Sequence, residues 1–297
     1  DPHRDVEQYL NAARALGYEI THVIETHTHS DFVSGARELA RRTGAPIYLS
    51  VASEHGYPYV PLHDNDCLRI GYLNIQVLFT PGHTPDHLCF TVADTRRSNE
   101  PSLVLTGDTL FVGDVGRPDL EGTSTVAREL AALQAQSAEE FAENLLAGQP
   151  PFPAHWERIR TLNRQGPRVL GGAPVLEPLP PEEVATLLAH GHFVLDVREP
   201  YSYGGAHVPG ALNIWLSPQL TTWASWFVPG DRPLILVADR PEEAVQAARW
   251  LVLVGFDRFS GYLAGGMDAR HKPGQPKAHR AQITVPELQT PQAPRYG

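Results

Sequence analysis

Three loops of this chain carry side chains of the kinds that bind metal ions. His27, His29 and Asp31 alternate behind an apolar run, while His83 lies in "TPGHTPDH" and Asp108 in "TGDTLF". Two histidines and one carboxylate can hold one face of an ion and leave the opposite face open, which suits Fe(II) and O2 chemistry. The same ligand types hold Zn(II) with a bound water for hydrolysis. The residues therefore predict a metal site and leave the metal open.

These loops follow segments with the pattern of buried strands. Since strand ends gather at one edge of an α/β sheet, we expect the three loops to converge. Helical spacing of apolar residues, each time closed by a glycine, predicts helices at 5–17 and 33–44. The predicted strands of this part of the chain lie at 20–27, at 45–50, within 68–94 and at 102–111.

A second α/β pattern follows a proline-rich stretch at 149–181, which is the best candidate for a linker. It has predicted helices at 180–191 and 240–255 and strands between and after them. We therefore expect domains at 1–165 and 166–275. The Pro- and Gln-rich tail at 276–297 is expected to lack a packed core.

Composition excludes several classes of protein. The 297 residues have a net charge of −10 and no basic run, which argues against nucleic-acid binding. No apolar run approaches 18 residues, so no membrane span is expected. Only two cysteines occur, which predicts a reducing cytoplasmic location. The chain begins at Asp1 without a Met or a signal peptide, so a preceding piece is expected to be missing.

Several residues near the predicted site have more than one interpretation. His29 and Asp31 could bind a metal or could support the ligands from behind. Thr106 is expected to brace the Asp108 loop by a hydrogen bond, and Gly82 to allow a tight turn. For the remaining histidines nearby we expect ordinary surface or core packing: His22, His55, His63 and His87.

The motifs "THTHSDFVSG", "TPGHTPDH" and "TGDTLFVGDVGRPDL" resemble the metallo-β-lactamase superfamily, and within it the bacterial persulfide dioxygenases fused to rhodanese domains. The resemblance implies an αββα sandwich. It also implies that His27, His83 and Asp108 bind iron, with His29 and Asp31 beside it. Arg117 and Asp119 match a loop that lies near the substrate in this family. Arg117 could clamp a carboxylate of the thiol carrier.

The chain departs from this family pattern at three places. The signature H-x-H-x-D-H ends here in Phe32 instead of histidine. The family also has a hairpin before Asp1, and a few dozen residues after Leu120 with a "PAHG" motif. In this chain the nearest candidate, His155, comes too late. We therefore expect an incomplete sandwich with a site for one metal.

The second α/β pattern resembles a rhodanese domain. "VLDVRE" with Asp196 and Arg198, the turn at 207–213 and "LAGGM" at 263–267 carry the resemblance. Rhodaneses have a nucleophilic cysteine after the strand "LILV", whereas here that position is Ala238. We expect a rhodanese-like domain without sulfurtransferase activity, used for packing or docking. The tail motif "ITVPELQ" weakly resembles the start of a further, truncated rhodanese domain.

The function that these features favour is that of a mononuclear non-haem Fe(II) dioxygenase. It would oxidise glutathione or coenzyme A persulfide with O2 to sulfite and the thiol. One alternative is a Zn-dependent thioester hydrolase of the glyoxalase II type. A second alternative is a non-catalytic sulfur-relay or scaffold protein. The expected partners are the small persulfide and O2, with a sulfurtransferase or a second copy of the chain as a further partner.

Overall fold

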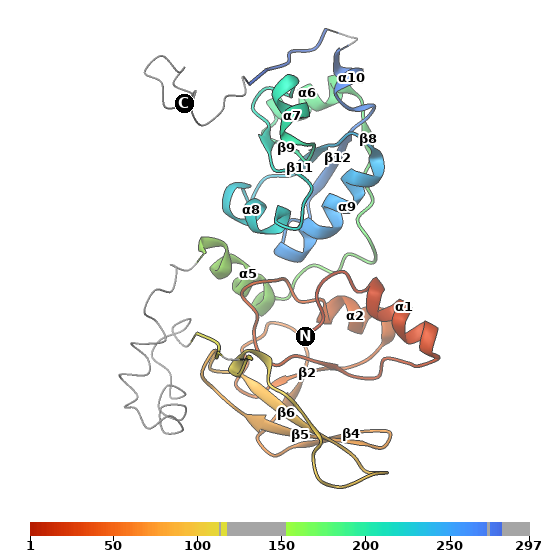
Figure 1. Ribbon diagram of the computed structural model, residues 1–297, viewed down its shortest axis with the longest axis vertical. Helices are drawn as coiled ribbons and strands as arrows, with labels where there is room; N and C mark the ends of the chain where they lie inside the picture. Colours follow the sequence, from red (N-terminus) through yellow and green to blue (C-terminus); the bar gives the residue numbers. More distant parts are fainter. Residues whose placement is uncertain (113, 118–152, 272–273, 281–297) are drawn as a thin grey trace. The chain divides into compact units, whose positions relative to one another are not determined.

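The chain forms two α/β units. The computed structural model describes residues 1–112, 114–117, 153–271 and 274–280. Unit 1 comprises Asp1–Gly172 and unit 2 comprises Ala173–Gly297 (Figure 1). Both units combine helices with sheets, which confirms the predicted α/β class. Asp119 and the motif "ITVPELQ" lie outside the described residues.

Unit 1 contains two described sheets. A parallel sheet has the order β1 (Val23–Ile24), β2 (Ile47–Ser50), β3 (Val60–Leu62). An antiparallel sheet has the order β4 (Cys67–Ile70), β5 (Leu73–Phe79), β6 (Leu88–Asp94), β7 (Leu103–Leu105). Since β5 and β7 are both antiparallel to β6, they run in the same direction and end at the same edge. The Leu88 amide at the start of β6 donates to the Thr26 carbonyl at 2.7 Å, which joins this edge to the end of β1.

The helices of unit 1 end where the sequence predicts. α1 (Glu7–Leu16) and α2 (Ala36–Thr43) are followed by Gly17 and Gly44, whose φ values of 69° and 77° are the left-handed geometry of a helix stop. A 3₁₀ turn, η1 (Gly107–Thr109), follows β7. A further helix, α5 (Ala154–Gln165), lies inside the stretch expected as a linker. Its Ile159 is fully buried, so this part of the stretch belongs to the body of unit 1.

Unit 2 is built on a five-stranded parallel sheet. The order is β10 (Leu212–Asn213), β9 (Phe193–Asp196), β11 (Leu234–Val237), β12 (Phe259–Leu263), β8 (Pro178–Leu179). All four residues of β11 are buried, as expected for a central strand that is covered on both faces. The helices are α6 (Pro181–Ala189), α7 (Pro200–Gly205), α8 (Leu220–Phe227), α9 (Pro241–Leu251) with the 3₁₀ turn η2 (Val252–Val254), and α10 (Gly266–His271).

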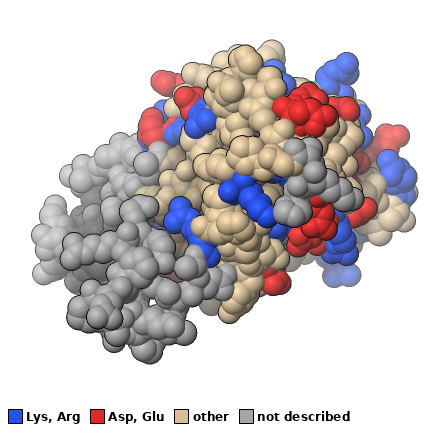
Figure 2. Space-filling model, turned by 90° about the horizontal axis from the view of Figure 1, so that it is seen from above, with Lys and Arg blue, Asp and Glu red and all other residues tan. Residues whose placement is uncertain are grey.

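Two general features of the described residues bear on function. None of the described helices has the length and apolarity needed to cross a membrane. On the face seen in Figure 2, positive and negative side chains are interspersed and no broad basic patch forms. The full sequence carries a net charge of −10.

Candidate metal centre

Three of the predicted residues converge at the common edge of the two sheets in unit 1. His27 follows β1, His83 follows β5, and Asp108 lies in η1 behind β7. The Nε2 atom of His83 lies 3.4 Å from the Asp108 Oδ2 atom, and that of His27 lies 3.9 Å from it. All three ligand atoms lie within 4.8 Å of one another. Since metal–ligand bonds are about 2.0–2.2 Å long, one ion can reach all three with small shifts.

Hydrogen bonds fix which nitrogen each histidine presents. The Arg117 carbonyl lies 3.1 Å from His83 Nδ1 and can only accept, so His83 carries its proton on Nδ1. The Thr26 hydroxyl donates to the Asp1 carboxylate and lies 2.9 Å from His27 Nδ1, so it accepts the His27 proton. Both histidines therefore present an unprotonated Nε2 to Asp108, as metal ligands must.

Burial keeps these two histidines neutral. It lowers the pKa of His27 well below the usual value, an effect reinforced by the neighbouring histidines His29, His87 and His83. Burial also lowers the pKa of His83, against the opposing attraction of Asp108. A neutral imidazole is the form that binds a metal, so the donor set fits a divalent transition-metal ion.

The Asp108 turn is held from both sides. The Thr106 hydroxyl donates to the Leu110 carbonyl at 2.9 Å and so closes the turn that contains Asp108. The Asp108 amide donates to His87 Nε2 at 3.0 Å. Gly116 crosses directly over the turn, because a Cβ there would lie 2.0 Å from the Asp108 carbonyl oxygen and 2.8 Å from His83 Nδ1.

His29 does not share the donor cluster of His27, although both come from the same short segment. Its Nε2 lies 3.1 Å from Asp1 Oδ1 and 3.4 Å from Glu25 Oε2, and its Nδ1 lies 3.7 Å from Asp31. Burial alone would lower its pKa, but Asp31 and Glu25 raise the pKa of His29 to about 9. Asp1, Glu25 and His29 form a second group with metal-type spacing, and His29 is a cation within it at neutral pH.

The backbone after His29 is held by a residue from far along the chain. Asn163, on α5, donates from Nδ2 to the carbonyls of His29 and Phe32 at 2.8 and 2.9 Å. Its Oδ1 accepts the Ser34 amide at 2.9 Å. The Phe32 ring lies 4.2 Å from the His29 ring, centroid to centroid. Asn163 thus places an aromatic ring beside His29, at the position where the superfamily signature has a further histidine.

A buried carboxylate connects the two histidine loops. Asp86 is 5% exposed and accepts the hydroxyls of Thr28 at 2.6 Å and Ser53 at 2.8 Å. Burial would raise its pKa, but the hydrogen bonds from these two hydroxyls lower the pKa of Asp86. Thr28 lies between His27 and His29, so this network ties the first ligand loop to the second.

The other predicted residues are placed as follows. The Arg117 carbonyl touches His83, and the role of this residue and of Asp119 in substrate binding stays a prediction. His155 is the second residue of α5 and belongs to neither metal-type group among the described residues. Sequence inspection missed the supporting roles of Glu25, Asp86 and Asn163. Only the polar character of Glu25 and Asp86 beside a ligand motif could have suggested them.

In unit 2 two of the rhodanese-type residues form a buried ion pair. Arg198 Nη2 lies 2.6 Å from Asp196 Oδ2, and the Asp196 side chain is fully buried. Ala238 follows β11 and is 5% exposed. Neither Cys67 nor Cys89 belongs to this unit. No thiol stands at the end of the central strand.

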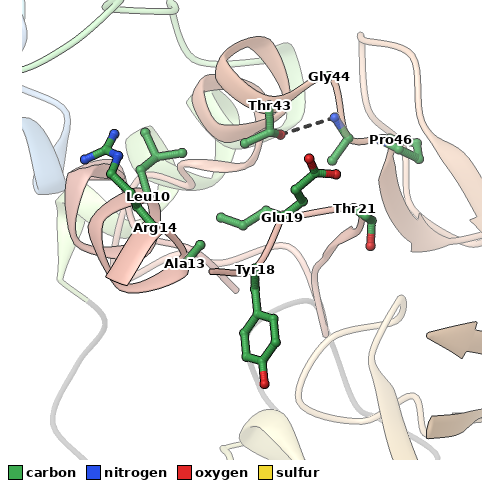
Figure 3. Close-up of a pocket in the computed structure, with 11 residues that line it drawn as sticks. Leu10, Ala13, Arg14, Tyr18, Glu19, Thr21, Thr43, Gly44 and Pro46 are labelled. Atoms are coloured by element: carbon green, nitrogen blue, oxygen red, sulfur yellow. Dashed lines mark hydrogen bonds between the residues drawn. The ribbon is translucent and has the colours of Figure 1, made fainter. Parts of the chain in front are cut away.

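Two cavities lie away from the triad. One, of about 590 Å³, lies in unit 1 between the ends of α1 and α2 and the segment 18–21, with Tyr18 and Glu19 among its lining residues (Figure 3). The other, of about 540 Å³, lies in unit 2 and is lined mainly by apolar side chains that include Trp215 and Trp223. Neither cavity contains a residue of the triad.

Comparison with known proteins defines the class. Residues 1–158 match the model of the metallo-beta-lactamase superfamily, and residues 180–272 match the rhodanese-like domain. A metallo-beta-lactamase from Staphylococcus aureus overlays 89% of this chain and 90% of its own, with 26% identity and a TM-score of 0.76. ETHE1 from Myxococcus xanthus overlays 55% of this chain and 85% of its own, with 25% identity and a TM-score of 0.48.

A sequence relative is hydroxyacylglutathione hydrolase from Methylococcus capsulatus, 30% identical over 202 residues that cover 60% of this chain and 77% of the relative. The chain spans about half the length of the enzymes of that name from Rhodospirillum rubrum and Cereibacter sphaeroides. The protein belongs to the metallo-beta-lactamase superfamily, and its superfamily domain is followed by a rhodanese-like domain. Both assignments confirm the predicted fold.

Proposed function

We propose that this protein is a mononuclear Fe(II) persulfide dioxygenase. The observation that carries the proposal is the division of the histidines: His27 and His83 face Asp108, while His29 faces Glu25 and is flanked by Phe32. Among the residues that the structure describes, His27, His83 and Asp108 are thus the one group that combines two neutral histidines with a carboxylate, which is the donor set of non-haem Fe(II) oxygenases. A bound Fe(II) would supply the redox chemistry that joins a thiol persulfide, O2 and water into sulfite and the free thiol.

The chain's own residues would hold and orient the reactants. His27, His83 and Asp108 would bind the iron, and Arg117 is the proposed contact for a carboxylate of the thiol carrier. Glutathione is a low-molecular-weight thiol with carboxylate groups, so it fits the proposed contact with the Arg117 guanidinium.

The second candidate is a Zn(II)-dependent thioester hydrolase, which the names of the sequence relatives favour. A binuclear hydrolytic site needs ligands for a second ion. Here the second group with metal-type spacing, Asp1, Glu25 and His29, contains a histidine that is protonated at neutral pH and is flanked by Phe32. This arrangement favours the oxygenase over the hydrolase.

For unit 2 we propose a docking or packing role, because Ala238 offers no sulfur nucleophile.

The test compares both activities in one preparation. The full chain, loaded separately with Fe(II) and Zn(II) under anaerobic conditions, would be assayed for O2 uptake and sulfite with glutathione persulfide, and for hydrolysis of S-lactoylglutathione. We expect Fe(II)-dependent O2 uptake that is lost in His83→Ala and retained in the matched control His63→Ala, an exposed histidine. Zn(II)-dependent thioester hydrolysis without O2 uptake would overturn the proposal. Failure to bind either metal would support the scaffold alternative.

A gain-of-function variant sharpens the comparison. Phe32→His restores the ligand type that the superfamily signature has at this position. If Phe32 enforces a single-metal site, this variant should bind a second equivalent of Zn(II), measured by elemental analysis. It should also gain thioester hydrolysis relative to the parent chain.

A further inference from the structure

His87 lies directly behind the metal triad and contacts two of its members. It is fully buried and comes four residues after His83, just before β6. Its Nε2 lies 3.0 Å from the Asp108 amide nitrogen, and its ring stacks on that of His27 with centroids 5.0 Å apart and planes at 20°. His87 nevertheless belongs to neither metal-type group of the described residues.

The hydrogen bonds of His87 determine its tautomer. A backbone amide can only donate, so Nε2 accepts from Asp108 and carries no proton. Nδ1 therefore bears the proton, and two hydroxyl oxygens are placed to accept it: Thr80 Oγ1 at 3.1 Å and Thr109 Oγ1 at 3.0 Å. With its Nε2 lone pair committed to the backbone, His87 has no free lone pair for a metal ion.

The contact with Asp108 constrains the turn that delivers the carboxylate. Asp108 sits in the 3₁₀ turn η1, whose first amides lack partners within the turn. His87 satisfies one of them. The turn also packs tightly on this ring, because a Cβ at Gly107, where φ is +48°, would lie 2.8 Å from His87 Nε2. The distance from Asp108 Oδ2 to His83 Nε2 thus depends on where His87 holds the turn.

We propose that His87 is a positioning residue of the metal centre. It holds the Asp108 turn through Nε2 and the His27 ring through stacking, and it does not bind the ion. The inference rests on the metal site in the proposed function but not on the identity of the metal or of the reaction. A histidine that only filled the core would be replaceable by any side chain of similar volume.

Two substitutions separate positioning from filling. His87→Leu keeps an apolar side chain in the core and removes the acceptor for the Asp108 amide. His87→Gln can place an amide oxygen near the position of Nε2 and restore that acceptor. The matched controls are His22→Leu and His22→Gln, because His22 also stacks on an aromatic ring, that of Tyr48, at 5.1 Å and lies outside the triad.

The experiment titrates the metal-free full chain with Co(II), reading affinity by chelator competition and ligand geometry from the visible spectrum. Loss of a supporting hydrogen bond weakens metal binding by about 10- to 100-fold. We expect that loss and an altered spectrum for His87→Leu. We expect near-parental values for His87→Gln and for both His22 variants. Parental affinity and spectrum in a folded His87→Leu chain would refute the positioning role.

A second variant covers the case in which His87→Leu does not fold. Thr80→Val with Thr109→Val removes both acceptors of the Nδ1 proton and leaves the histidine in place. A weaker Co(II) affinity and a changed spectrum would support the inference, and parental values would overturn it. If the parent chain itself binds no Co(II), the metal site and the proposed function fail together with the inference. Parental binding that is unchanged in the variants refutes only the role of His87.

Discussion

Replacement of Asn163 by alanine should both destabilise unit 1 and weaken its metal site. The side chain is 2% exposed and makes three hydrogen bonds, to the Ser34 amide and to the carbonyls of His29 and Phe32. Removing it leaves three backbone groups without this partner. At about 1 kcal/mol for each lost bond, the lower end of the range for buried groups, the cost is about 3 kcal/mol. For a unit of this size that corresponds to a fall in Tm of roughly 6–12 °C.

The assay is thermal unfolding of the metal-free chain, followed by near-UV circular dichroism with separate fits for the two units. The matched control is Gln165→Ala, which removes an exposed amide side chain from the end of the same helix. The same variants would be titrated with Co(II), and Asn163→Ala should bind it more weakly because the loop that follows His27 is released. A Tm within about 2 °C of both the parent and the control would refute the reasoning, since it would mean that the three bonds contribute nothing net.

Three further predictions follow from the geometry. Gly116→Ala should lower the Co(II) affinity at least about tenfold, because the added Cβ would lie 2.0 Å from the Asp108 carbonyl oxygen. Calorimetric titration measures this affinity, and an unchanged value would contradict the close approach. Arg198→Met should destabilise unit 2 by about 3–5 kcal/mol, because it leaves the buried Asp196 carboxylate without its ion-pair partner. Urea unfolding measures this cost, and a value below about 1 kcal/mol would contradict the prediction. In the metal-free chain, the pKa of about 9 for His29 exceeds its unfolded value of 6.5, so its contribution to stability is complete below pH 6.5 and is lost as the pH rises through 9. Urea unfolding should show that loss in the parent and a flatter profile in His29→Gln.

The local elements of this protein could be predicted because their signals are local. Gly17 and Gly44 mark the ends of α1 and α2, and both adopt the left-handed conformation that glycine allows. The run "LILV" has no polar residue, and it forms the central, fully buried strand β11. No strand is predicted at 60–62, whereas the structure has the short strand β3 there, with Pro61 at its centre. β3 pairs with β2 and lies at the edge of the described sheet, where a proline is tolerated.

The limits of prediction are clearest at α5. Proline density marked its surroundings as a linker, and nothing in the sequence near Asn163 indicates that its amide reaches a loop about 130 positions earlier. Such a contact depends on how the helix packs against unit 1. The same limit applies to His87, for which ordinary surface or core packing was expected. It is indeed buried, yet its hydrogen bond to Asp108 joins two loops that lie 21 residues apart.

The sequence alone determined which chemistry this protein can attempt. It supplies two histidines and a carboxylate at strand ends in unit 1, a phenylalanine where a further ligand would stand, and alanine in place of a nucleophilic thiol in unit 2. Only the tertiary structure decided which donor atoms face one another. His27 and His29 are two residues apart, yet one faces Asp108 and the other faces Glu25. The physical reason is that burial and hydrogen bonding set the direction, tautomer and charge of an imidazole, and its partners here come from segments that meet only when the chain folds.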